Sequence, residues 1–176
     1  VEQTRKLLHH RGPDDWGHKT LQSHGRQVTF VHTRLVVQDP TPFGKQPMMS
    51  RDGTWCINFN GEIYNHFTLR SRIEGELQGT SDTETLVEFL ARYGIEETLA
   101  LLNGIFAFAA INIESGELFL ARDPFGVKPL YHAQSGDTFY YSSGIRPLVE
   151  AGCGSGMDPA ALEAFLSLRY VPSPMT

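Results

Sequence analysis

The alternation of apolar and polar residues predicts strands in two parts of the chain, with helices between them. Residues 54–59 alternate strictly, and residues 27–37 contain a β-branched and aromatic run; both patterns are typical of strands. Asn60 and Gly61 follow the alternating segment. This dipeptide favours a tight hairpin, and residues 62–64 are then expected to form the returning strand.

Helical spacing dominates the middle of the chain. Apolar residues at intervals of two to four predict an amphipathic helix over 67–77. Ser81 precedes Glu84 by three residues, which is the pattern of a capping box at the start of a second helix. Gly94 is expected to close that helix, and a shorter one is expected over 96–102.

The pattern then returns to strands. Residues 105–111 are nearly all apolar, as in a strand that is buried on both faces. Short helices are expected near both ends of the chain, and further strands are expected at 117–121, 130–133 and 138–142. Strands, then helices, then strands, without regular βαβ alternation, favour an α+β fold of antiparallel sheets covered by helices.

A glycine-rich stretch divides the chain unequally. Gly152, Gly154 and Gly156 mark a flexible join, and Asp158 is placed to cap a last helix that ends before prolines. We therefore predict one domain over residues 1–152 and a connector over residues 153–176.

Composition excludes several classes of function. The 176 residues carry 15 Lys and Arg against 20 Asp and Glu, a formal net charge of −5, which argues against nucleic-acid binding. No run approaches the roughly 18 apolar residues of a membrane span. The chain has only two cysteines and does not open on an apolar signal segment, so a reducing compartment, the cytoplasm, is predicted. Its seven histidines show no metal-ligand spacing, and no metal is expected.

Four positions carry candidate chemistry. The Asn60 amide and a backbone N–H at Gly61 could together form an oxyanion hole, although the pair could equally serve only as a turn. Arg34 could hold a carboxylate through its two-pronged guanidinium, or it could be a surface arginine. Asp82 could bind an ammonium group, or it could complement the dipole of its helix. Neither cysteine lies in a setting that predicts a nucleophile.

Six segments in series resemble the glutaminase domain of class II glutamine amidotransferases, specifically of the glutamine-hydrolysing asparagine synthetase type. The similarity covers nearly the whole chain. The segments are His10-Arg11-Gly12-Pro13-Asp14, Arg34-Leu35, Phe59-Asn60-Gly61-Glu62-Ile63-Tyr64-Asn65, Ser81-Asp82-Thr83-Glu84, residues 121–131 (ARDPFGVKPLY) and Arg169-Tyr170-Val171-Pro172-Ser173-Pro174.

The resemblance implies an N-terminal-nucleophile αββα sandwich, in which two antiparallel sheets face each other with helices outside. It also implies that a cysteine thiolate attacks the side-chain amide of glutamine. Asn60 and the Gly61 N–H would then stabilise the oxyanion. Arg34 would bind the α-carboxylate of glutamine, and Glu62 and Asp82 would bind its ammonium group.

In this family the nucleophile is the first residue of the mature protein and begins an opening strand. No segment of the sequence from Val1 onward resembles that strand. We therefore expect this cysteine upstream of Val1, and expect the chain by itself to be inactive and to hold no cofactor. The resemblance implies a covalently linked synthetase domain that uses ATP and Mg²⁺ to amidate aspartate or a related acceptor, and homodimers as one form of assembly.

Two other interpretations stay open. The chain could be an amidotransferase-like scaffold or binding module that has lost its nucleophile, as in the β-lactam synthetase relatives. A self-sufficient hydrolase of another N-terminal-nucleophile family is disfavoured by the predicted connector helix.

Overall fold

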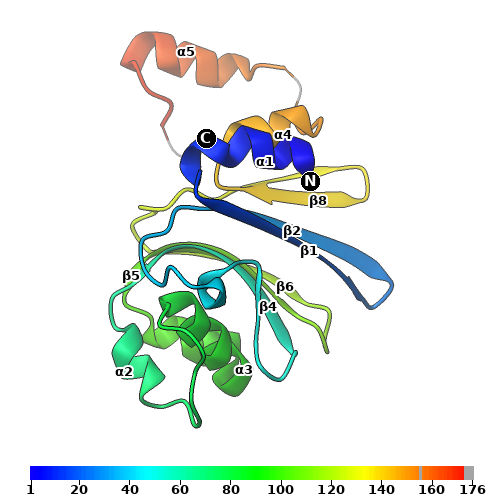
Figure 1. Ribbon diagram of the computed structural model, residues 1–176. Helices are drawn as coiled ribbons and strands as arrows, with labels where there is room; N and C mark the ends of the chain where they lie inside the picture. Colours follow the sequence, from blue (N-terminus) through cyan, green and yellow to red (C-terminus); the bar gives the residue numbers. More distant parts are fainter. Residues whose placement is uncertain (155, 173–176) are drawn as a thin grey trace.

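The computed structural model describes residues 1–154 and 156–172. Two layers of strands lie against each other with helices on their outer sides (Figure 1): α1 and α4 lie above one layer, and α2 and α3 lie below the other. In chain order the elements are α1 (Glu2–Leu8), the 3₁₀ turn η1 (His9–Arg11), β1 (Asp15–Ser23), β2 (Arg26–Arg34), the 3₁₀ turn η2 (Pro42–Gly44), β3 (Met48–Met49), β4 (Trp55–Ile63), α2 (His66–Arg70), α3 (Asp82–Leu101), β5 (Gly104–Asn112), β6 (Leu118–Arg122), β7 (Tyr131–Ser135), β8 (Thr138–Ser142), α4 (Ile145–Glu150) and α5 (Pro159–Leu168).

The central sheet is antiparallel with strand order β3-β4-β5-β6. One face of β4 carries Ile57, Phe59 and Ile63, which belong to a core cluster with Leu86 and Phe89 of α3. This is the face that the alternation of residues 54–59 predicted to be apolar. The main hydrophobic core therefore lies between the central sheet and α3, and it fixes the N-terminus of α3 next to the end of β4.

The second layer consists of the hairpins β1-β2 and β7-β8, which share no ladder among the described residues. Phe30 of β2 packs with Cys56, Ala109 and Ile111 on the other face of the central sheet. These apolar contacts close one end of the space between the two layers. The αββα layering and the antiparallel sheets agree with the fold expected from the sequence.

The Asn60–Gly61 pair is not a hairpin, and this prediction was wrong. β4 runs unbroken from Trp55 to Ile63 and pairs along its whole length with β5, Gly61 lying opposite Phe106. A Cβ atom at Gly61 would lie 2.3 Å from the carbonyl oxygen of Ile105. The glycine therefore serves close strand packing, a function that local turn statistics do not reveal.

Two other predictions need correction. β1 was not expected, because its polar and aromatic residues alternate without an apolar face; four of its nine positions are exposed. The helix predicted over 67–77 is only the five residues of α2, and the chain from Ile73 onward forms a loop. Gly94, with φ of 76°, does end the first helical segment of α3, and the second segment, which runs to Leu101, agrees with the shorter helix predicted over 96–102.

The remaining helices are near their predicted positions. Asp158 caps α5 by accepting hydrogen bonds from the N–H groups of Ala160 and Ala161. Ser173 and Pro174 of the closing motif lie outside the described residues, so that part of the predicted connector has no structural description. Within residues 1–154 and 156–172, no helix is both long and apolar enough to cross a lipid bilayer.

Candidate active site

All five residues predicted to bind glutamine line one cavity of about 460 Å³. Its lining joins the end of β2, the second half of β4, the start of α3 and the loop between β2 and η2. The predicted residues in it are Arg34, Asn60, Gly61, Glu62 and Asp82. Residues separated by up to 48 positions in sequence therefore meet at the open end of the space between the two layers.

Asn60 supplies an unpartnered hydrogen-bond donor. Its Nδ2 is buried and has no hydrogen-bond partner among the described residues. Leaving a buried amide N–H unsatisfied costs about 1–3 kcal/mol, so such a group is rare unless a ligand completes it. The orphaned amide indicates that the cavity is shaped for a hydrogen-bond acceptor.

The N–H of Gly61 is directed to the same edge of β4. Along this edge the Phe59 N–H donates to Gln46 Oε1 at 2.6 Å, and the Ile63 N–H donates to Asp82 Oδ2 at 2.9 Å. Backbone N–H groups two residues apart in a strand point the same way, and hence the Gly61 N–H also points away from β5. Across the ladder, Phe106 exchanges hydrogen bonds with Asp123 instead of with Gly61, which agrees with this direction.

Arg34 is buried at the end of β2, where its guanidinium packs against Gly44. Its Nη atoms donate to the backbone carbonyls of Asp39 and Thr41. These bonds use part of the five-donor guanidinium and fix its plane, and the other N–H groups can serve a carboxylate. The arginine is thus a preorganised cation, as its predicted role requires.

Asp82 is the first residue of α3 and is buried. Burial raises the pKa of its carboxyl group to about 6, the N–H of Ile63 opposes that shift, and the charge of Glu62 adds to it. Two neighbouring carboxylates repel each other, and a bound ammonium group would relieve the repulsion. The lining therefore offers a cation for an α-carboxylate and a pair of carboxylates for an α-ammonium group.

Sequence reasoning missed two glutamines in the lining. Gln38 Nε2 donates to Glu62 Oε2, and Gln38 Oε1 accepts from the N–H of Asp82 at 3.2 Å. Gln46 satisfies the Phe59 N–H and donates to Thr83 Oγ1 at 3.3 Å. A glutamine residue in a loop belongs to no hydrophobic period and to no motif. These two side chains reach the cavity only because of the conformation of the loops that carry them.

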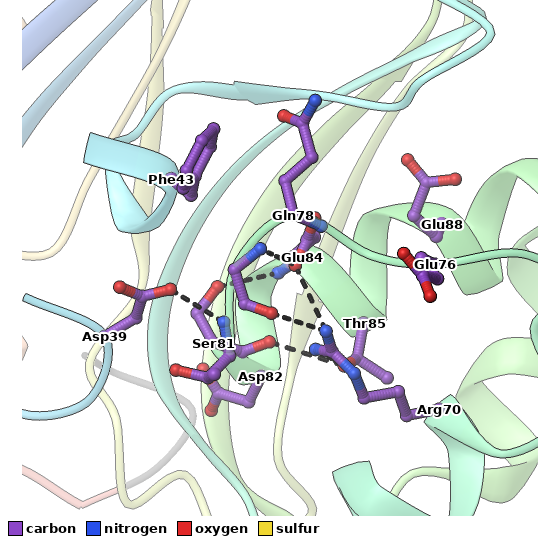
Figure 2. A network of polar contacts seen from close by, with 12 residues as sticks. Asp39, Phe43, Arg70, Glu76, Gln78, Ser81, Asp82, Glu84, Thr85 and Glu88 are labelled. Atoms are coloured by element: carbon purple, nitrogen blue, oxygen red, sulfur yellow. Dashed lines mark hydrogen bonds and ion pairs between the residues drawn. The ribbon is translucent and has the colours of Figure 1, made fainter. Parts of the chain in front are cut away.

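Asp39 connects the Arg34 loop to the segment before α3 (Figure 2). Its Oδ2 accepts from the Thr80 N–H at 2.7 Å and its Oδ1 from the Thr41 N–H at 2.8 Å. Burial alone would raise the pKa of Asp39, but these hydrogen bonds outweigh it and hold the pKa below its usual value. The backbone carbonyl of Asp39 also accepts from Arg34. Asp39 therefore fixes both the Arg34 guanidinium and the segment before α3.

The segment before α3 is itself anchored by Glu84 (Figure 2). The Glu84 carboxylate accepts from the N–H groups of Gln78 and Gly79 at 2.7 Å and 2.9 Å. Ser81 Oγ accepts from the Glu84 N–H at 3.1 Å, which confirms the predicted cap at Ser81, although the Glu84 side chain turns to the preceding loop. These bonds anchor the residues on both sides of Asp82.

Neither cysteine of the chain lines the cavity. Cys56 is fully buried in β4, and burial raises the pKa of its thiol to about 11. Cys153 is also buried. Both thiols are therefore kept away from the cavity in this structure.

The glutamine amidotransferase domain model matches residues 1–176. The chain belongs to this family. It is 37% identical over 179 residues to asparagine synthetase (glutamine-hydrolysing) 1 of Bacillus subtilis, covering 100% of this chain and 27% of that protein. It is 38% identical over 131 residues to the asparagine synthetase of Mus musculus, covering 74% of this chain and 23% of that protein.

A solved structure supports the fold. The glutamine phosphoribosylpyrophosphate amidotransferase of B. subtilis aligns with a TM-score of 0.69 and 20% sequence identity over 84% of this chain and 39% of that one. The chain spans about a quarter of the length of the curated relatives above. Family and fold are thus those expected from the six motifs.

Proposed function

We propose that this domain hydrolyses glutamine to glutamate and ammonia. The observation that carries the proposal is the unpartnered Asn60 amide, which lies in a cavity that also holds Arg34, Glu62 and Asp82. A free α-amino acid with a side-chain carbonyl needs this combination: a cation, a pair of anions and a donor for the carbonyl oxygen.

In the proposed reaction, a thiolate attacks the side-chain carbonyl carbon of glutamine, and the carbonyl oxygen becomes an oxyanion. Asn60 Nδ2 and the Gly61 N–H donate to that oxygen. The C–N bond then breaks, and the nitrogen leaves as ammonia with the proton that the α-amino group of the nucleophile had taken from the thiol. Water hydrolyses the thioester and gives glutamate.

The nucleophile is proposed to be a cysteine that precedes Val1. This follows the family resemblance, and it is supported by the position of Cys56 and Cys153, which lie outside the cavity lining. The ammonia is proposed to serve a covalently linked synthetase domain that uses ATP and Mg²⁺ to amidate aspartate to asparagine, as the names of the relatives suggest.

The direct test is release of glutamate and ammonia from glutamine by the complete protein that carries this chain. Saturable turnover is expected, with Arg34→Met raising KM at least about tenfold because a charged hydrogen bond to the carboxylate is lost. A variant of an exposed arginine on the same strand, Arg26→Met, provides the control.

A scaffold without glutaminase activity is the second candidate, because neither cysteine of the chain lines the cavity. Calorimetry separates the two. Glutamine binding without turnover by the complete protein would favour a binding module, and neither binding nor turnover would favour a scaffold; either result would contradict the glutaminase proposal.

A further inference from the structure

The side chain of Gln38 lies in the cavity and connects β4 to α3, the two elements that carry the carboxylates of Glu62 and Asp82. Its Nε2 donates to Glu62 Oε2 on β4, and its Oε1 accepts from the backbone N–H of Asp82 at the start of α3. No other residue of the described chain bonds to both Glu62 and Asp82 through its side chain.

The partners leave only one orientation for the amide. The Asp82 N–H can only donate, so it must face an oxygen, and an ionised Glu62 can only accept, so it must face the NH₂ group. Turning the amide over would place two donors together and two oxygens together. Gln38 is therefore a rigid, neutral bridge that matches both partners at once.

We propose that Gln38 is a positioning residue for recognition of the substrate ammonium group: it holds Glu62 and Asp82 as one unit and so sets the affinity for glutamine. The inference rests on the proposed function, because it assigns to Glu62 and Asp82 the ammonium group of glutamine. Gln38 acts through Glu62 and takes no part in bond breaking.

A neutral side chain is essential in this place. Glu62 and Asp82 already bring two acidic groups together, and the amide supplies a donor without adding a third charge. The other charged or titratable groups that line the cavity are His10, Arg11, His32, Arg34, Asp39 and Lys128. These residues are unchanged in the variants below, so comparison with wild type at each pH cancels their titration.

The first variant is Gln38→Leu in the complete protein. Loss of hydrogen bonds that involve a charged group predicts a KM for glutamine about tenfold higher, with kcat changed less than about threefold. Gln27→Leu, at an exposed position of β2, is the matched control and should keep both constants. Thermal melts of both variants establish that they are folded.

The second variant, Gln38→Glu, has a readout that a merely structural role would not produce. A protonated carboxyl group can donate to Glu62 and accept from the Asp82 N–H as the amide does, whereas an ionised one cannot donate. The ratio of the variant KM to the wild-type KM should therefore approach one as the pH falls towards 5 and rise as the pH increases to 8.

The outcomes separate the inference from the proposed function. If wild type turns over glutamine but Gln38→Leu behaves like Gln27→Leu, or if the Gln38→Glu ratio falls with rising pH, the inference is wrong and the glutaminase proposal stands. If wild type neither binds nor hydrolyses glutamine, both are overturned.

Discussion

Asn58 and Asn60 lie two residues apart on the same face of β4, yet their amides have opposite surroundings. Asn58 Nδ2 donates to the Val31 carbonyl at 3.0 Å and contacts the Tyr141 hydroxyl, and its Oδ1 contacts His32 Nδ1 at 2.8 Å. Asn60 Nδ2 has no partner among the described residues.

This contrast marks a boundary between two regions of one interlayer space. Towards Cys56 the space is closed by apolar packing with Phe30, and Asn58 satisfies the polar groups beside it. Towards Glu62 the space opens into the cavity. The comparison teaches that one amide is satisfied by the fold itself, whereas the donor of the other is left for the ligand that the proposed function assigns to it.

The largest expected effect is that of Asn60→Ala on catalysis. Removing one oxyanion-hole donor lowers kcat by about 10²–10³-fold. The unfolding free energy should not fall, because no intramolecular hydrogen bond of the side-chain Nδ2 is lost and the cost of burying that unpartnered donor is removed. Steady-state glutaminase assays and urea unfolding of the complete protein measure the two quantities. A near-wild-type kcat for Asn60→Ala would show that Asn60 does not contribute to the oxyanion hole.

The next largest effect concerns Asp82 and pH. Its pKa is raised to about 6 in the folded state from the ordinary value of 3.8, so the folded state holds the proton more tightly. Stability from this group is therefore present below pH 4 and is lost as the pH rises to 6, by up to about 3 kcal/mol. Asp82→Asn should remove this loss.

Unfolding of wild type and Asp82→Asn between pH 4 and pH 7 measures the difference. The variant should gain stability relative to wild type across this range, and its KM for glutamine should rise because the carboxylate is gone. Parallel stability curves would show that Asp82 ionises normally. Asp137→Asn, at an exposed turn between β7 and β8, is the control.

A smaller effect is expected for Asn58→Ala, and it is opposite in kind to that of Asn60→Ala. The substitution leaves the Val31 carbonyl and His32 Nδ1 without their partner, which costs about 2 kcal/mol of unfolding free energy. The kcat of the folded variant should stay within about threefold of wild type. A large kcat loss with unchanged stability would reverse the assignment of the two asparagines.

The smallest effect is that of Ser81→Ala at the start of α3. Loss of the hydrogen bond to the Glu84 N–H should lower the unfolding free energy by about 1 kcal/mol. Ser167→Ala, exposed within α5, should cause no loss and serves as the control. Denaturant unfolding compares the two; equal values would mean that the cap does not hold the cavity end of α3.

The sequence was sufficient to predict the family, and the five residues that its motifs nominated line one cavity. It did not predict the setting of Asn60 and Gly61, because the strand that pairs with them, β5, begins more than 40 residues later. Local turn preference was outweighed by that long-range ladder.

Gln38 was missed for a different reason. Its role depends on the route of the loop between Arg34 and η2, which is fixed by Asp39 bonding to the Thr80 N–H and to Thr41. The contact with Thr80 joins residues that are 41 positions apart in the sequence. A glutamine in a loop carries no periodic signal from which such a bridge could be deduced.

The central claim is that the Asn60 amide completes its hydrogen bonding with the side-chain carbonyl of glutamine. A crystal structure of the complete protein with glutamine bound, its nucleophile replaced by alanine, tests this directly. The account predicts a distance of about 2.9 Å between Asn60 Nδ2 and the side-chain carbonyl oxygen of glutamine, with the α-carboxylate on Arg34. Glutamine bound with its side-chain amide away from Asn60, or outside this cavity, would contradict it.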